Sequence, residues 1–245
     1  MGRYTTTVPA DNMGVPQQAP TTQYSSSPYS NYGQPQQQYG NPYGGMPQQP
    51  QLPPDWPTFF PKPVIGLERN GVFVENSEST ITSSGQIHFI PGSLEAIRMM
   101  RMKGYKVVIL FDEPGIQKGK VSTHQVDAMN QYLMQAFGQA GILSIDGLLY
   151  STTELKEDMY AKPNTGMFKR AETDFPIGIN WKEGWFVGHN LKDASAADRV
   201  GAIPVILKTG NGEKTLKKME TTGNMSLRKK TLVFENLLEF ANSLE

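Results

Sequence analysis

The 245-residue sequence contains no cysteine, so it forms no disulfide bond and no thiolate metal site, which suits a reducing compartment. Net charge is also absent, because 23 Lys and Arg residues balance 23 Asp and Glu residues. No run reaches the ~18 apolar residues of a membrane span, and the start of the chain lacks the apolar core of a signal peptide. We therefore expect no membrane partner and a location in the cytoplasm or in a larger assembly such as a virion, without secretion by a signal peptide.

Residues 1–60 have few charges and no hydrophobic periodicity. They hold 10 Gln, 11 Pro and 6 of the 10 Tyr, and only Arg3, Asp11 and Asp55 are charged. Such a segment cannot bury enough apolar surface to offset about 1–2 kcal/mol of backbone entropy per residue. We predict a low-complexity, intrinsically disordered arm at 1–60 and one domain at 61–245.

Two roles for this arm remain open. It is either a flexible linker or an adhesive arm that becomes ordered on protein partners in a larger assembly. In the second case the tyrosines are sparse anchors, and Trp56, Phe59 and Phe60 attach the end of the arm to the domain.

After residue 60, short apolar runs alternate with amphipathic segments. This alternation predicts an α/β fold, a Rossmann-like parallel sheet with helices on both faces. Residues 72–90 alternate only weakly around a Ser-Ser-Gly turn and predict a short hairpin or flap. The predicted strands are 64–67, 106–111, 145–150, 185–188, 203–207 and 231–234, and the predicted helices are 93–103, 122–137, 165–172, 192–200 and one from 236.

The first predicted strand ends in a polar tip, Glu68-Arg69-Asn70-Gly71. Ligands of open α/β sheets bind outside the carboxyl ends of the strands, so this tip is a candidate site. Three later segments, 107–116, 161–167 and 187–193, also combine a short apolar or turn sequence with polar residues.

These four segments, in this order, resemble the four motifs of the haloacid dehalogenase superfamily of phosphatases. Within it they are similar to the uncapped branch of heptose-bisphosphate and histidinol-phosphate phosphatases. The resemblance covers about residues 63–245 and leaves room for a flap but not for a large cap domain. It implies a HAD-like fold, an in-line carboxylate nucleophile, a phosphate-neutralising lysine and bound Mg²⁺.

Several motif positions depart from the family pattern. Glu68 replaces the nucleophilic Asp, and its extra methylene moves the carboxylate oxygen by about 1 Å. A displacement of this size can lower the reaction rate about 10²-fold. Asn70 replaces the general acid/base and lacks a titrating proton. General acid–base catalysis contributes about 10²–10⁴-fold to the reaction rate, so this contribution is expected to be missing. Phe111 replaces a phosphate-binding Thr and His189 a metal-binding acid, while Lys162 and Asp193 are kept. The loop 151–158 has no Cys or His, so the zinc site of that branch is absent as well.

We therefore expect the catalytic positions Glu68, Asn70, Phe111 and Lys162 and the metal positions Glu68, Asn70, His189 and Asp193 to be degenerate. No cofactor is expected, with Mg²⁺ bound only if the site is active. The main hypothesis is a non-enzymatic pseudoenzyme, a structural or interaction protein attached to an assembly through residues 1–60.

Two other hypotheses remain. The first is a divergent, Mg²⁺-dependent phosphomonoester phosphatase that uses Glu68 and a relocated acid such as Asp112. The second is a nucleic-acid-associated protein, suggested by a basic stretch between 214 and 230. No aromatic residue is interleaved with these basic residues, so a solvated face is the better reading and nucleic acid is not the expected partner.

Overall fold

The computed structural model describes residues 62–77, 79–142, 144–175 and 177–245. The predicted arm at 1–60 lies outside these residues, together with its proposed anchors Trp56, Phe59 and Phe60. Its boundary and its binding to partners therefore stay predictions.

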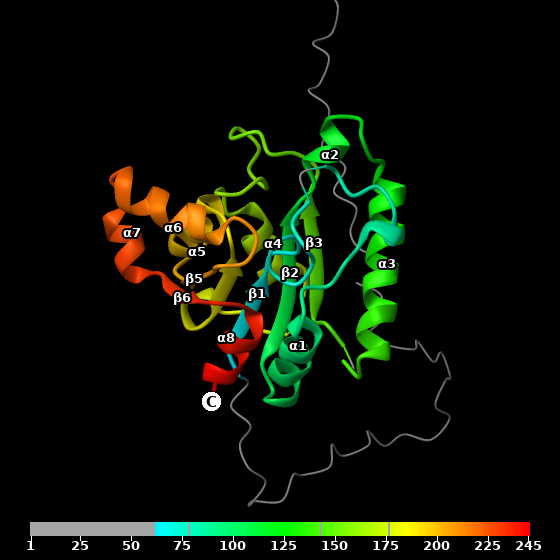
Figure 1. The fold of residues 1–245 in the computed structure, drawn as a ribbon, viewed down its shortest axis with the longest axis horizontal. Helices are drawn as coiled ribbons and strands as arrows, with labels where there is room; N and C mark the ends of the chain where they lie inside the picture. Colours follow the sequence, from blue (N-terminus) through cyan, green and yellow to red (C-terminus); the bar gives the residue numbers. More distant parts are fainter. Residues whose placement is uncertain (1–61, 78, 143, 176) are drawn as a thin grey trace, which may run out of the picture.

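The described residues form one sheet of six parallel strands, which confirms the predicted fold class. The central strand β1 (Val64–Leu67) pairs with β2 (Lys106–Asp112) on one side and with β4 (Trp185–Gly188) on the other. The order across the sheet is β3-β2-β1-β4-β5-β6, so the direction of chain progression reverses at β1 (Figure 1). The outer strands are β3 (Gly147–Ser151), β5 (Ile203–Leu207) and β6 (Leu232–Phe234).

Helices cover both faces of the sheet, as the continuous apolar strands require. One face packs against α1 (Ser93–Met102), α3 (Thr123–Gln139) and α8 (Leu237–Ser243), and the other against α4 (Gly166–Asp174) and α5 (Leu191–Val200). Because strand side chains alternate in direction, Ile65 and Leu67 lie in the first core and Val64 in the second. No helix in the described part of the chain is both long and apolar enough to cross a membrane.

The segment 72–90 was predicted to be a short hairpin or flap, and its described residues form no regular hairpin. It contains isolated bridges from Val74 to Asn70 and to Phe89 and a short 3₁₀ helix at Ser84–Gln86. Val72, Phe73 and Val74 are buried in the core, so the start of this segment packs against the domain.

Three helices were not predicted: α2 (Pro114–Gln117), α6 (Gly212–Thr221) and α7 (Met225–Lys230). The basic stretch lies on the last two. Leu216 and Met219 bury the inner side of α6 against the sheet, and its lysines are exposed. The sequence of α6 has only these two apolar residues among its lysines. Its hydrophobic periodicity is therefore too weak to distinguish a helix from a charged loop.

Gly66 tests the packing of the central strand. A Cβ at this position would lie 2.5 Å from Phe186 Cδ2 and 3.0 Å from the Trp181 ring. We expect Gly66→Ala to lower the free energy of unfolding by about 1–3 kcal/mol, because a close-packed core relaxes only partly around an added methyl group. Urea denaturation measures the change. At Gly85 a Cβ would meet no atom within 4 Å, so the control Gly85→Ala should change stability by less than about 0.5 kcal/mol; equal effects would contradict this account.

Candidate functional site

The site lies at the carboxyl ends of the three central strands. Glu68 follows β1, Asp112 ends β2 and His189 follows β4. Parallel register holds these ends at one edge of the sheet, where Leu67 aligns with Ile109 on one side and with Val187 on the other. The loop after β3 brings Lys162 to the same edge.

Lys162 joins two carboxylates in a buried cluster. Its Nζ pairs with Glu68 Oε2, lies 2.8 Å from Asp193 Oδ1 and donates to the Leu110 carbonyl at 3.3 Å. The side chains of Lys162 and Asp193 are both 0% exposed. Asp193 Oδ2 accepts hydrogen bonds from the backbone N–H groups of His189 and Asn190, so this carboxylate also caps α5. A cation and two acids far apart in sequence therefore form one cluster.

Burial and charge give these three groups different proton affinities. Burial raises the pKa of Glu68 to about 7, against the attraction of Lys162. Burial would also raise the pKa of Asp193, but Lys162 outweighs it and lowers the value to about 2. Burial alone would lower the pKa of Lys162, yet the carboxylates of Asp193 and Glu68 raise it above its usual range. Near neutral pH, Glu68 is thus the member of the cluster that changes charge.

Asp112 lies in a second ion pair beside the first. Lys192 Nζ donates to Asp112 Oδ2 at 2.7 Å, and the Lys162 backbone N–H donates to Oδ1 at 3.3 Å. Both carboxylate oxygens of Asp112 are therefore engaged by donors of the fold. Sequence reasoning missed Lys192, although it directly precedes Asp193 in the fourth motif.

Asn70 and Phe111 belong to another cluster, built around Arg69. Arg69 Nη2 donates to Glu113 Oε2 at 2.6 Å, Nε donates to Asn70 Oδ1 at 3.0 Å, and the guanidinium lies 4.0 Å from the centre of the Phe111 ring. Phe111 is packed in the core that also holds Ile65 and Leu67. The structure therefore brings Glu68, Lys162 and Asp193 together, and joins Asn70 and Phe111 to Arg69 and Glu113, which sequence reasoning did not single out.

His189 connects the first motif to the loop after β5. Its Nδ1 accepts a hydrogen bond from the Asn211 backbone N–H at 2.9 Å, and its Nε2 lies 2.9 Å from the Asn190 side-chain amide. The ring fills the space over Gly71 and Gly210, where a Cβ would lie 2.5 Å from Nδ1. Burial lowers the pKa of His189, which keeps the ring neutral. Both ring nitrogens are thus engaged in hydrogen bonds of the fold.

The donor set does not fit Mg²⁺, which takes about six oxygen ligands in octahedral geometry. Glu68 and Asp193 both face the Lys162 ammonium, and His189 offers no oxygen and no unoccupied nitrogen. Within the described residues, no group of three or more His, Cys, Asp or Glu is arranged to hold a metal ion. The cation that balances these acids is supplied by the chain itself.

Comparison with known proteins identifies relatives over most of the domain. The sequence profile of the family described as polynucleotide kinase 3 phosphatase matches residues 72–222. The D-glycero-beta-D-manno-heptose-1,7-bisphosphate 7-phosphatase of Pseudomonas putida is 32% identical over 180 residues, which cover 73% of this chain and 97% of the relative. The enzyme of the same name from Neisseria meningitidis serogroup A is 28% identical over 179 residues, covering 73% and 92%.

A solved structure is similar as well. The D,D-heptose 1.7-bisphosphate phosphatase of B. bronchiseptica, crystallised with magnesium and phosphate, has a TM-score of 0.65 and 27% identity, and the match covers 74% of this chain and 96% of that chain. The fold and branch suggested by the four motifs are therefore confirmed.

The prediction of a non-enzymatic structural protein, and with it of a pseudoenzyme or virion component, is wrong. Relatives with 32% and 28% identity over most of the chain are named as phosphatases, which supports the alternative hypothesis. The substitutions at Glu68, Asn70, Phe111 and His189 together predicted an inactive site. The physical reason for the correction is that Glu68, although longer than Asp, still places a carboxylate against Lys162 at the end of the central strand.

Lys162 tests how far the cluster depends on its one cation. We expect Lys162→Ala to lower the free energy of unfolding at pH 7 by about 3–5 kcal/mol, because Asp193 is left buried without its cation. Urea denaturation measures the loss. The control is Lys118→Ala, whose partner Glu154 is 45% exposed; it should cost less than about 1 kcal/mol. Similar losses in the two variants would contradict the assigned role of Lys162.

Proposed function

We propose that this chain, which belongs to the polynucleotide kinase 3 phosphatase family and to the heptose-bisphosphate phosphatase-like branch of the haloacid dehalogenase-like superfamily, hydrolyses phosphomonoesters. The observation that carries the proposal is the buried Glu68 carboxylate at the end of β1, paired with Lys162. The relatives' names support phosphate-ester chemistry. The proposal is limited to that class, since the matched proteins are named for different phosphate esters.

Glu68 is the nucleophile in this proposal. One carboxylate oxygen attacks phosphorus, the ester P–O bond breaks, and a glutamyl phosphate forms while the alcohol leaves with a proton from water. Water then attacks the phosphorus of this intermediate, releases inorganic phosphate and restores the carboxylate. Both steps transfer the phosphoryl group without a redox change.

Lys162 supplies the positive charge that phosphoryl transfer requires. Its ammonium contacts the nucleophile and is anchored by Asp193, so it is already in position when negative charge moves onto the phosphoryl oxygens. Lys192 adds a second cation at the same edge of the sheet, through its pair with Asp112. Because the residues do not fit Mg²⁺, no step of the proposed mechanism passes through a metal.

Asn70 makes proton transfer the weak part of this mechanism. Its side-chain oxygen accepts a hydrogen bond from Arg69, and its amide has no acidic proton to transfer to a leaving alkoxide. Asp112 is ion-paired and does not replace it. Esters whose leaving group is stable without a proton, such as 4-nitrophenyl phosphate, are therefore the substrates that this site handles best.

The first test is turnover of 4-nitrophenyl phosphate by the full chain. We expect Glu68→Ala to lower kcat/KM by about 10³-fold or more, because the nucleophile is removed. The control Glu154→Ala removes an exposed acid from its pair with Lys118 and should leave kcat/KM within about twofold. Wild-type activity equal to that of Glu68→Ala would refute the proposed function.

Two further readouts belong to the same assay. Glu68 attacks only as the carboxylate, so kcat/KM should rise with pH through about 7, well above the value of 4.5 for an ordinary Glu. Assays with Mg²⁺ and with a chelator should agree within about twofold, because Lys162 and not a metal balances the charge. A profile that is flat from pH 5 to 8 argues against Glu68 as the titrating nucleophile, and activity lost in the chelator argues against the metal-free mechanism.

The second test restores the missing proton donor. We expect Asn70→Asp to raise kcat/KM for an alkyl phosphomonoester by about 10²-fold, since an acid at this position can protonate the alkoxide. For 4-nitrophenyl phosphate the gain should be less than about fivefold, because that leaving group needs no proton. Asn242→Asp, at an exposed amide of α8 far along the chain from the Glu68 cluster, is the matched control. Equal gains for both esters would show that Asn70 does not limit proton transfer.

A further inference from the structure

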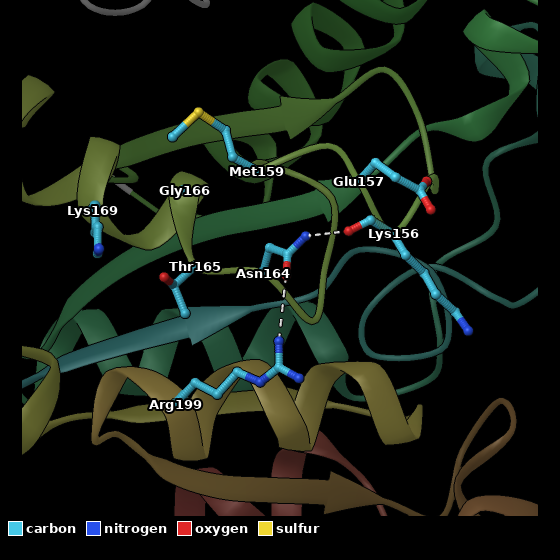
Figure 2. A pocket seen from close by; sticks show the side chains of 8 residues that line it. All are labelled: Lys156, Glu157, Met159, Asn164, Thr165, Gly166, Lys169 and Arg199. Carbon is cyan, nitrogen blue, oxygen red and sulfur yellow. Dashed lines mark hydrogen bonds between the residues drawn. The ribbon is translucent and has the colours of Figure 1, made fainter.

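A cavity of about 560 Å³ lies beside the loop that carries Lys162 (Figure 2). One wall is the loop between β3 and α4, with Lys156, Glu157 and Met159. The amino end of α4 and the side chain of Arg199 on α5 form the rest. None of the residues of the Glu68 cluster lines it.

The charged lining of this cavity is mostly cationic. The lining contains three cations, Lys156, Lys169 and Arg199, and one carboxylate, that of Glu157. Within the part of the chain that the structure describes, none of the three cations forms an ion pair. Elsewhere on this surface such pairs are common, as between Arg170 and Asp174. The lining of the cavity therefore carries an excess of positive charge that no carboxylate of the described residues neutralises by an ion pair.

The amino end of α4 adds further donors to the same cavity. Thr165 occupies the N-cap position, but its side chain makes no capping hydrogen bond. At Gly166 a Cβ would lie 2.5 Å from the Met159 carbonyl oxygen, so the glycine lets the loop pass close to the helix end. The Gly166 N–H donates to that carbonyl at 2.9 Å, which leaves the next N–H groups of the first turn as the donors of this helix end. Unsatisfied N–H groups and the helix dipole at an amino terminus favour an anion.

Hydrogen bonds brace the walls of the cavity. The Asn164 amide donates to the carbonyls of Lys156 and Asp158, both at 2.8 Å, and Arg199 Nη1 donates to the Pro163 carbonyl at 3.0 Å and to Asn164 Oδ1 at 3.4 Å. Figure 2 shows Asn164 between the loop and Arg199. These bonds use only one nitrogen of the guanidinium. Among the residues that the structure describes, the other Arg199 donors and both lysine ammonium groups have no hydrogen-bond partner and can bind a ligand.

We propose that this cavity binds a phosphate group of a small phosphorylated ligand, at a site separate from Glu68. A phosphate carries up to two negative charges and several acceptor oxygens, which match the three cations of the lining and the amino end of α4. The cavity volume suits a ligand of nucleotide or sugar-phosphate size. The proposal goes beyond phosphomonoester hydrolysis and does not depend on chemistry at Glu68.

Inorganic phosphate is the probe, followed in the full chain by amide NMR at Met167 in the first turn of α4. We expect the Met167 signal to shift with saturation in the wild type. The affinity for phosphate, measured from the shift of the Met167 signal, should fall about tenfold or more in the double variant Lys156→Gln/Lys169→Gln. The control Lys214→Gln/Lys217→Gln removes the same charge from exposed positions of α6 and should change affinity less than about twofold.

Hydrolysis of 4-nitrophenyl phosphate separates this site from the catalytic one. The Lys156→Gln/Lys169→Gln variant should keep wild-type kcat/KM while it loses the phosphate response at Met167. If the chain has no phosphatase activity, the NMR titration still decides the proposal. An unshifted Met167 signal, or equal loss of affinity in both double variants, would overturn it.

Discussion

The buried contact of Lys162 with Glu68 and Asp193 is the interaction on which the site depends. Removal of three charges from water is costly, and only their mutual attraction in a dry site offsets this cost. Asp193 is also tied to the start of α5 by two backbone hydrogen bonds. The same carboxylate thus anchors a helix and the buried Lys162 ammonium, so the position of Lys162 relative to β1 follows from the packing of α5.

Alternation of side chains along the strands divides the polar residues between two faces. Glu68 lies on the same face of the sheet as Gly66, where a Cβ at Gly66 would meet Phe186. The ammonium of Lys162 lies 5.0 Å from the centre of the Phe186 ring. Arg69 takes the other direction, over Phe111. The loss of a hydroxyl at Phe111 is therefore compensated by packing and not by chemistry, since the aromatic ring serves as a platform for a buried guanidinium.

The loop from β3 to α4 has two roles in this architecture. At one end it delivers Lys162 to Glu68, and at the other it lines the cationic cavity with Lys156 and Asn164. Arg199 donates a hydrogen bond to the carbonyl of Pro163, which directly follows Lys162. A ligand in the cavity would thus contact the same rigid segment that positions the ammonium, although its phosphate lies outside the Glu68 cluster.

Sequence alone determined the class of fold and the placement of the site at the sheet edge. Apolar runs set the strands, and four ordered motifs identified Glu68, Lys162 and Asp193, because backbone periodicity and motif order are local properties of the chain. The helix α6 was missed because its period is weak, and the pairing of Lys192 with Asp112 because the two residues are 80 positions apart. Which charges become buried together, and hence that the pKa of Glu68 lies near 7, was decided by tertiary structure, since desolvation and Coulomb attraction depend on distances that no local pattern contains.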